Sequence, residues 1–352
     1  MKILILALSG IGDALMFTPA LKLLRNSLPE VQIDALVMFE GTKDIYKRNP
    51  DINDVIYFNF LKEGVVRSLK FALSLRNKYD ISINVYPSNR KEYNIINFLV
   101  GAKKRAATKY LRKDFQNLGF LNNVRVTEDD FRHNVSTNIM LCEKLLNKKF
   151  KEEPSMNFYL TNEDTNNAGS FLSSINIKEN DLVVGFHPGS ATIKNHAKRR
   201  WEPEKFARLA QLLIENHNAK ILIFGGSDEN ELKEKINYQI NSSHSFIVNN
   251  DNIAKTAAIM QRCNVFVTND SSLMHVASSL KLKIVAILGP TNPNYIHPWK
   301  TEHQIVRLNL DCSPCFIYSP RPLICFRNDV LFKCIKELNV EMVYDAVLNF
   351  IN

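Results

Sequence analysis

Short apolar runs alternate with amphipathic stretches of helical period along the whole chain. In the first half the apolar runs predict buried strands, and they lie at 2–8, 33–39, 55–58 and 81–85. The stretches that predict helices lie at 14–28, 65–75 and 135–146. This alternation is typical of βα units built around a parallel sheet.

The same pattern restarts in the second half. Its predicted strands lie at 182–186, 221–224, 246–250, 265–267 and 284–288, with helices between them. A chain of 352 residues exceeds the usual size of one core, so we expect two domains, 1–165 and 166–335, with the polar stretch 147–165 as linker. The apolar stripe on the helix expected within 336–352 predicts a docking helix that returns to the first domain, in place of a membrane anchor.

The stretch 265–291 indicates strand, turn, helix and strand. Turn and capping residue types follow the first strand at 268–272, and Gly289-Pro290 ends the second. A βαβ unit places a helix N-terminus beside a strand's carboxyl end, where free N–H groups suit a diphosphate. The alternative is an ordinary crossover in which the Ser and Asn residues only cap a helix.

A glycine-containing turn follows the first strand. Gly10 and Gly12 permit a tight turn and a close approach, but the third glycine of a dinucleotide fingerprint is replaced by Leu15. A nicotinamide enzyme, with Glu40 on the ribose, is therefore only weakly indicated. Asp13 lies at the mouth of the expected sheet, where a carboxylate can act as a general base. The spacing alone favours a helix cap for Asp13.

The net charge of +9 is concentrated in the first half, where residues 1–160 hold 25 Lys and Arg against 17 Asp and Glu. This excess indicates an anionic partner, such as a phosphorylated acceptor, an acidic membrane face or nucleic acid. The alternative is a solvated surface from an AT-rich genome. No basic motif interleaved with aromatics supports nucleic acid. No apolar run nears the ~20 residues of a bilayer span, and we expect a cytoplasmic protein.

Several short motifs occur in a characteristic order. They are SGIGD near the amino terminus, then HPGS, KRRW, EPEKF, FGGSDE, TNDSSLMH and ILGPT. Together they resemble the heptosyltransferase family of glycosyltransferases over nearly the whole chain. The resemblance implies a GT-B type α/β fold, with two Rossmann-like βα domains facing a central cleft. It also implies inverting transfer of heptose from ADP-heptose to an acceptor, typically the lipopolysaccharide or lipooligosaccharide core.

The resemblance also assigns roles to residues. Asp13 becomes the general base for the acceptor hydroxyl, beside Gly12 in the donor site. Ser190 and Thr192 are expected to contact the donor phosphates, and Glu229 the ribose.

Asp270 is expected to hold the sugar, while Ser271 and Ser272 offer N–H groups to the diphosphate. The family often has Gly in place of Ser272, so close packing there is less certain. His275 matches a family histidine, and a structural hydrogen bond explains it equally well.

The leaving diphosphate needs a cation, which stabilises the developing charge. The family usually has Lys two residues before the tryptophan, where this chain has Arg199 beside Lys198. The Arg guanidinium supplies several N–H donors in one plane. The sequence leaves open whether Lys198 or Arg199 points inward. With these cations and backbone N–H groups, the chemistry needs no metal or other cofactor. The basic first domain is expected to bind the acceptor, with Arg90, Lys109 and Arg112 as candidates.

Four cysteines, spaced C-x2-C-x9-C-x8-C, lie close together in the sequence at Cys312, Cys315, Cys325 and Cys334. In a cytosolic chain such a set favours a structural zinc or iron site over disulfides. Unpaired buried thiols are the alternative. Some heptosyltransferase-like proteins that modify proteins bind iron through four cysteines.

Two rival functions remain open at this level. One is the same donor chemistry on a protein acceptor, as in autotransporter modification. The other is a sugar-nucleotide-binding protein without catalysis. A phosphorylated glycolipid acceptor would bring the protein into peripheral contact with the inner membrane.

Overall fold

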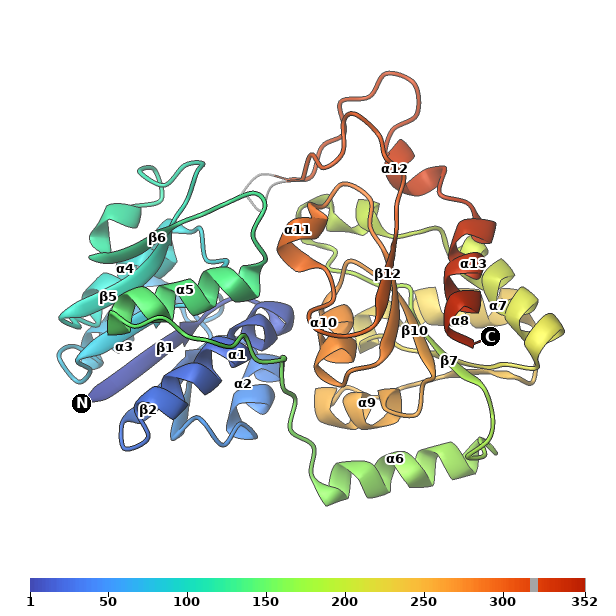
Figure 1. The fold of residues 1–352 in the computed structure, drawn as a ribbon, viewed down its shortest axis with the longest axis horizontal. Coiled ribbons are helices and arrows are strands. Elements are labelled where there is room, and N and C mark those ends of the chain that lie inside the picture. Colours follow the sequence, from blue (N-terminus) through green and yellow to red (C-terminus); the bar gives the residue numbers. More distant parts are fainter. Residues whose placement is uncertain (317–321, 352) are drawn as a thin grey trace. The chain divides into compact units, whose positions relative to one another are not determined.

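A computed structural model describes residues 1–316 and 322–351 of the chain (Figure 1). Its contacts divide into two compact units. The first is built from residues 1–159 with the short stretch 294–296, and the second from most of the remainder. The division falls a few residues before the expected boundary at 165.

The first unit contains a six-stranded parallel sheet in the order β3-β2-β1-β4-β5-β6. Its strands are β1 (Lys2–Ala7), β2 (Gln32–Val37), β3 (Asp54–Tyr57), β4 (Ile81–Asn84), β5 (Lys104–Lys109) and β6 (Val124–Thr127). β1 is buried at five of its six positions, as its apolar run predicts. This strand order is that of a Rossmann fold, with a reversal between β1 and β4.

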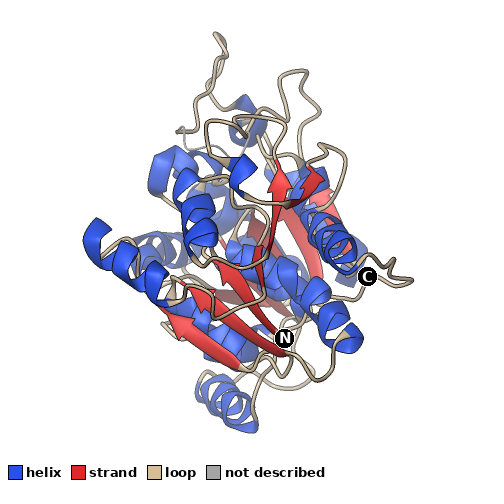
Figure 2. Cartoon of the chain, turned by 90° about the vertical axis from the view of Figure 1, so that its left-hand side faces the viewer, coloured by secondary structure: helices blue, strands red, loops and turns tan. Residues whose placement is uncertain are grey.

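Helices cover both faces of this sheet (Figures 1 and 2). They are α1 (Ile11–Ser27), α2 (Glu40–Lys47), α3 (Gly64–Ser74), α4 (Lys91–Leu99), the short η1 (Gly119–Leu121) and α5 (Asn134–Leu146). α1 packs against α2 and α5, whereas α3 contacts α4. One apolar core joins side chains of β1 and β2 to those of α4, including Leu6 and Ile96. Glu40 forms an exposed ion pair with Lys43 on α2.

The second unit repeats the architecture with the order β12-β11-β10-β7-β8-β9. Its strands are β7 (Val183–His187), β8 (Lys220–Ile223), β9 (Ser245–Ile247), β10 (Val265–Asn269), β11 (Lys283–Ile287) and β12 (His303–Val306). All registers are parallel, and the order reverses between β7 and β10. Ligands of open α/β sheets bind at such a reversal.

The remaining helices belong to the second unit, except that residues 294–296 of α11 belong to the first. They are α6 (Asn162–Ser174), η2 (Ile193–Arg199), α7 (Pro203–His217), η3 (Ser227–Glu229), α8 (Asn230–Ile240), α9 (Ile253–Met260), α10 (Ser272–Ser279), α11 (Pro293–Ile296), α12 (Lys333–Lys336) and α13 (Val340–Ile351). α6 packs on α9, which explains why the second unit begins inside the expected linker. Among the residues described, no helix combines the length and apolar character needed to cross a bilayer.

The terminal helix α13 differs from expectation in its docking partner. Its buried side chains, including Val343 and Val347, join the core of the second unit together with α7 and the inner strands. The indole N–H of Trp201 donates to the carbonyl of Leu338, 2.8 Å away, and fixes the turn that leads into α13. The expectation that this helix returns to the first domain was wrong, because its apolar stripe completes the face of the sheet beside α7.

Candidate active site

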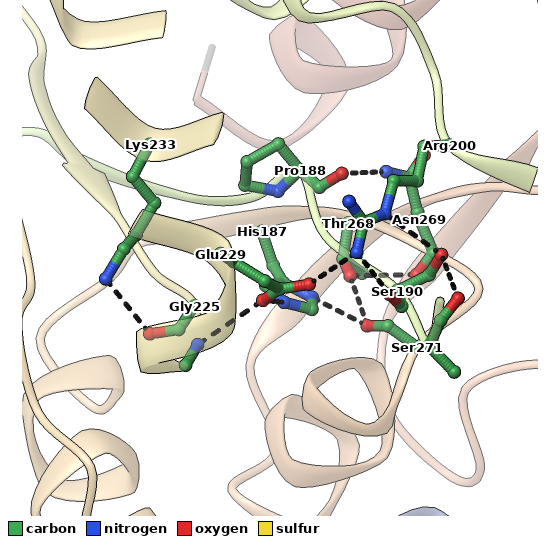
Figure 3. Close-up of polar contacts among 12 residues, drawn as sticks. His187, Pro188, Ser190, Arg200, Gly225, Glu229, Lys233, Thr268, Asn269 and Ser271 are labelled. Atoms are coloured by element: carbon green, nitrogen blue, oxygen red, sulfur yellow. Dashed lines mark hydrogen bonds and ion pairs between the residues drawn. The ribbon is translucent and has the colours of Figure 1, made fainter. Parts of the chain in front are cut away.

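Two polar loops meet at the reversal of the second sheet. His187 ends β7 and Asn269 ends the neighbouring β10. The Asn269 amide donates to the Pro188 carbonyl (2.7 Å) and accepts from the Trp201 N–H (3.0 Å) (Figure 3). This one buried side chain therefore joins the loops after both strands to the start of α7.

A buried ion pair lies beside this junction. The Arg199 guanidinium donates to the Asp270 carboxylate, and both side chains are less than a tenth exposed. The Thr291 hydroxyl donates to the same carboxylate oxygen at 2.6 Å. The Arg199 guanidinium also lies over the ring of Phe316, 5.2 Å from its centre. Two predicted site residues, Arg199 and Asp270, thus come together as a buried ion pair.

Lys198, the other cation considered before the tryptophan, is exposed. It precedes the buried Arg199 at the end of η2, so the structure answers the question that the sequence left open. Arg199 points inward, and its planar fork suits a site that holds both a carboxylate and an aromatic ring.

Glu229 is buried at the start of α8 and has three polar contacts. The Arg200 guanidinium lies 3.0 Å from Oε1, while His187 Nε2 and the Gly226 N–H lie 3.0 and 3.3 Å from Oε2. Burial raises the pKa of Glu229, but the His187 contact and the Arg200 charge outweigh it, so the net pKa is below the usual value. The predicted ribose acid is therefore an oriented carboxylate.

His187 connects this carboxylate to the start of α10. Its ring is buried, and Nδ1 lies 2.8 Å from the Ser271 hydroxyl, opposite the Glu229 contact (Figure 3). The Thr268 hydroxyl lies 3.1 Å from the same Ser271 oxygen. The ring therefore bridges the ends of β7 and β10 and the loop after β8.

α10 begins at Ser272, with Ser271 as its N-cap residue in extended conformation. The Ser271 hydroxyl makes no capping hydrogen bond, because it is directed to His187. The N–H groups of the first turn are thus not used by this cap, and no acidic side chain lies in that turn. This arrangement suits a bound anion, as the βαβ pattern predicts.

The HPGS loop places its two predicted phosphate contacts differently. The Ser190 hydroxyl is buried and lies 3.3 Å from both the His196 carbonyl and Arg200 Nε. Thr192 is exposed, at the N-cap of η2. Only Thr192 therefore presents its side chain to solvent, while Ser190 mainly shapes the loop.

His275 lies on α10 with its ring buried and Nδ1 without a hydrogen-bond partner. Burial lowers the pKa of His275 to about 4, against a smaller opposing effect of the Asp270 charge. The ring is therefore neutral at physiological pH. Burial therefore argues against a charged ligand contact by His275, and Nδ1 does not make the structural hydrogen bond that was the alternative.

In the first unit, Asp13 occupies the first turn of α1. Its carboxylate accepts from the Gly10 N–H at 3.2 Å and so caps the start of the helix, as the spacing predicted. Gly12 is buried beside it in the same turn. Across the sheet reversal, the Ser9 hydroxyl donates to the Pro87 carbonyl at 2.8 Å and ties the loops after β1 and β4. Asp13 thus lies at the ligand-binding edge of this sheet.

The three basic residues considered for the acceptor lie in different settings. Arg90 is the exposed N-cap residue of α4 and lies over the ring of Tyr93, whereas Lys109 is exposed at the end of β5. Arg112 forms a two-pronged ion pair with Asp130, with N–O distances of 3.0 and 2.8 Å. Its charge is therefore already matched, so Arg112 is the weaker candidate of the three.

The four late cysteines lie near one another, and all are free thiols. Three of them line a pocket of about 480 Å³ together with Arg327. Burial, followed by the neighbouring thiols, raises the pKa of Cys334 to about 11. Thiols are suitable ligands for zinc or iron. However, nowhere in residues 1–316 and 322–351 are three or more His, Cys, Asp or Glu side chains arranged to hold a metal ion. The thiols are therefore suitable donors for a metal, but their arrangement in the structure does not form a metal site. The predicted metal remains untested.

Sequence reasoning assigned no role to several residues of this site. His187, Arg200 and Thr291 contact candidate residues directly, and Asn269 joins the loops that carry them. Their signal was present, since His187 belongs to HPGS, Arg200 to KRRW and Thr291 to ILGPT. What the sequence did not reveal was which side chains of these motifs contact one another.

The chain is similar to curated heptosyltransferases over most of its length. It is 27% identical over 321 residues to lipooligosaccharide heptosyltransferase 2 of Haemophilus ducreyi, covering 88% of this chain and 89% of that protein. It is also 27% identical over 361 residues to the enzyme of the same name from Campylobacter jejuni, covering 100% and 98%.

Among solved structures, the chain resembles the ADP-heptose lipopolysaccharide heptosyltransferase II of Escherichia coli. The TM-score is 0.75 at 20% identity, over 99% of this chain and 98% of that one. This similarity confirms the GT-B type fold with two Rossmann-like units. The family model for glycosyltransferase family 9 (heptosyltransferase) matches residues 68–321. The protein with these two units and this site belongs to glycosyltransferase family 9, the heptosyltransferase family.

Proposed function

We propose that the protein transfers heptose from ADP-heptose to a lipopolysaccharide or lipooligosaccharide core, with inversion at the anomeric carbon. The observation that carries the proposal is the buried Arg199–Asp270 pair beside the N-terminus of α10. A cation and free N–H groups at one sheet edge suit a departing diphosphate. The names of the relatives support the donor and the core acceptor.

In this mechanism the second unit binds the donor. Glu229 accepts hydrogen bonds from the ribose, and Asp270 from the sugar hydroxyls. The first-turn N–H groups at Ser271 and Ser272 hold the diphosphate, with Thr192 as a further contact. Charge that develops on the leaving ADP is stabilised by Arg199.

Asp13 of the first unit is the proposed general base, with Gly12 leaving the turn open beside it. It takes the proton from the acceptor hydroxyl while that oxygen attacks the anomeric carbon opposite the diphosphate. A single displacement of this kind inverts the anomeric configuration. The capping role of Asp13 does not conflict with this, because a carboxylate has two oxygens and several lone pairs.

We propose that the acceptor's phosphates bind to the first unit, with Arg90 and Lys109 as contacts. We also propose a cytoplasmic protein that lies peripherally on the inner membrane. The support is α3, where only Ala72 is buried and Val65, Val66 and Leu69 are exposed. Five cations lie on or beside this helix: Lys62, Arg67, Lys70, Arg76 and Lys78. Exposed apolar residues among cations are typical of helices that lie on anionic lipid.

The test is a transfer assay with purified protein and ADP-heptose. One arm supplies heptose-deficient core lipid and the other a polypeptide acceptor. We expect heptosylated lipid, with the inverted anomer by NMR, and unchanged turnover in the presence of EDTA. Labelling of the polypeptide alone would replace the lipid acceptor with a protein. Absence of transfer with tight ADP-heptose binding would indicate a sugar-nucleotide binder.

A further inference from the structure

Phe316 contacts the inward cation of the donor site from a segment that the proposed function does not use. Its side chain is buried, and the Arg199 guanidinium lies over its ring, 5.2 Å from the ring centre. The ring of His196 meets the same ring edge to face, with centres 5.0 Å apart. Burial, followed by the Arg199 charge, lowers the pKa of His196 to about 4. Of these two neighbours, only Arg199 is therefore charged at physiological pH.

The backbone at Phe316 is fixed to the loop that also holds Asp270. The N–H groups of Cys315 and Phe316 donate to the Pro290 carbonyl at 3.0 and 2.9 Å. The next residue, Thr291, pairs with Phe316 in a parallel bridge and donates its hydroxyl to Asp270 at 2.6 Å. These two adjoining segments therefore contact both members of the buried ion pair, the carboxylate through a hydroxyl and the guanidinium through an aromatic ring.

The two contacts use different parts of the guanidinium. Its five N–H groups lie in one plane and point outward from the edge. A carboxylate accepts N–H groups at this edge, whereas an aromatic ring attracts the charge through the flat face. The ring can thus orient the guanidinium without using any of its N–H donors.

We propose that Phe316 is a positioning residue of the donor site, whose ring fixes the plane of the Arg199 guanidinium so that its edge presents N–H groups to the diphosphate. This inference rests on the proposed role of Arg199. Phe316 acts through Arg199 and takes no part in bond making. Its effect is largest where the leaving group carries most charge, in the transition state and in bound ADP, because ADP has a terminal phosphate that the sugar blocks in ADP-heptose.

The test replaces Phe316 in the full chain with phenylalanines that carry one, two or three fluorine atoms on the ring. Fluorine withdraws electron density from the face of the ring and weakens its attraction for a cation, while the volume of the ring changes little. We expect kcat for heptose transfer to fall stepwise along the series, by about tenfold in total, with the KM for ADP-heptose changed by less than about twofold. The dissociation constant of ADP should rise in the same order.

Phe98 on α4 is the matched control, because the Arg105 guanidinium lies 5.5 Å from the centre of its ring. The same fluorinated residues at Phe98 should leave kcat and the dissociation constant of ADP unchanged. Phe316→Leu, which keeps an apolar side chain and removes the aromatic face, should lose as much kcat as the trifluorinated ring. Thermal unfolding of each variant checks that it is folded, and the fluorinated series carries the test should Phe316→Leu not fold.

The outcomes are distinguishable. If kcat and the affinity for ADP did not depend on the number of fluorine atoms at Phe316, the ring would only fill space; this would overturn the inference and leave the proposed function standing. A wild type that binds ADP and transfers no heptose would contradict the proposed function, while the ADP affinities of the series would still decide the inference. Failure of the wild type to bind ADP would contradict both.

Discussion

The Arg199 guanidinium donates to the Asp270 carboxylate inside the second unit, where both side chains are buried. The pair sits at the point where the sheet order reverses, next to the first turn of α10. A cation held in this way has little left to reorganise when a leaving group develops charge beside it. The pair therefore serves both the fold and the proposed chemistry, and the two roles can be separated by mutation.

Arg199→Met leaves Asp270 as a buried carboxylate with only its hydroxyl donor. We expect the free energy of unfolding to fall by about 3 kcal/mol, because a broken buried pair strands one charge. Chemical denaturation measures this loss. The matched control is Lys198→Met at the exposed neighbour, which should change stability by less than about 0.5 kcal/mol. Equal effects of the two substitutions would contradict the assignment of Arg199 as the inward cation.

Gly189→Ala tests the close packing of the HPGS loop on Glu229. The new Cβ would lie 1.8 Å from the carboxylate, so Glu229 must move. We expect the dissociation constant of ADP to rise at least about tenfold, the equivalent of one hydrogen bond to a charged group. Gly169→Ala on α6, where a Cβ would meet nothing within 4 Å, is the control and should leave ADP binding unchanged. An unaltered affinity in Gly189→Ala would remove Glu229 from the donor site.

Acid should destabilise the fold through His275. Burial holds its pKa at about 4, below the ordinary value of about 6.5, so the unfolded chain takes up a proton first as pH falls. Stability is complete above about pH 6.5 and is lost as pH falls towards 4, by about 3 kcal/mol in total. Denaturation curves measured between these pH values give the free energy of unfolding at each pH. As pH falls, this free energy should decrease more steeply for the wild type than for His275→Asn. Parallel pH profiles would show that the ring is not neutral and buried in the fold.

The exposed face of α3 gives a prediction for membranes. The triple substitution Val65→Ser, Val66→Ser and Leu69→Ser removes three apolar side chains that are exposed in the structure. We expect partitioning to anionic vesicles to fall about tenfold or more, with little change in stability. Tyr238→Ser on α8, at another highly exposed side chain, is the control. Vesicle sedimentation measures the effect, and unchanged partitioning of the triple variant would exclude α3 as the contact.

Most of the architecture was predictable from hydrophobic patterning. Strands with continuous apolar runs, such as β1 and β10, were predicted to within about two residues. The strands that were missed lack this signal, because β5 (KRAATK) is buried mainly through two alanines and a threonine. α6 was interpreted partly as linker, because its sequence NEDTNNAGSFLSS is polar and only its contact with α9 shows its place.

The site was predictable only as a set of motifs. Asp270 and Glu229 were expected from the family resemblance, and the structure supplies the partners that orient them. His187 and Asn269 act by joining loops that are about 80 residues apart in the chain. Such contacts depend on strand order, and a single sequence gives no direct signal for it.

The central claim is that Asp13 removes the proton of the acceptor hydroxyl. The most direct measurement is the steady-state rate of heptose transfer by Asp13→Asn compared with the wild type, with ADP-heptose and core lipid. Asn retains the size and can still accept the Gly10 hydrogen bond, so the cap is kept while the base is lost. The account predicts that kcat falls by about 10²–10⁴-fold with the KM for ADP-heptose nearly unchanged. A variant that transfers heptose at the wild-type rate would contradict it.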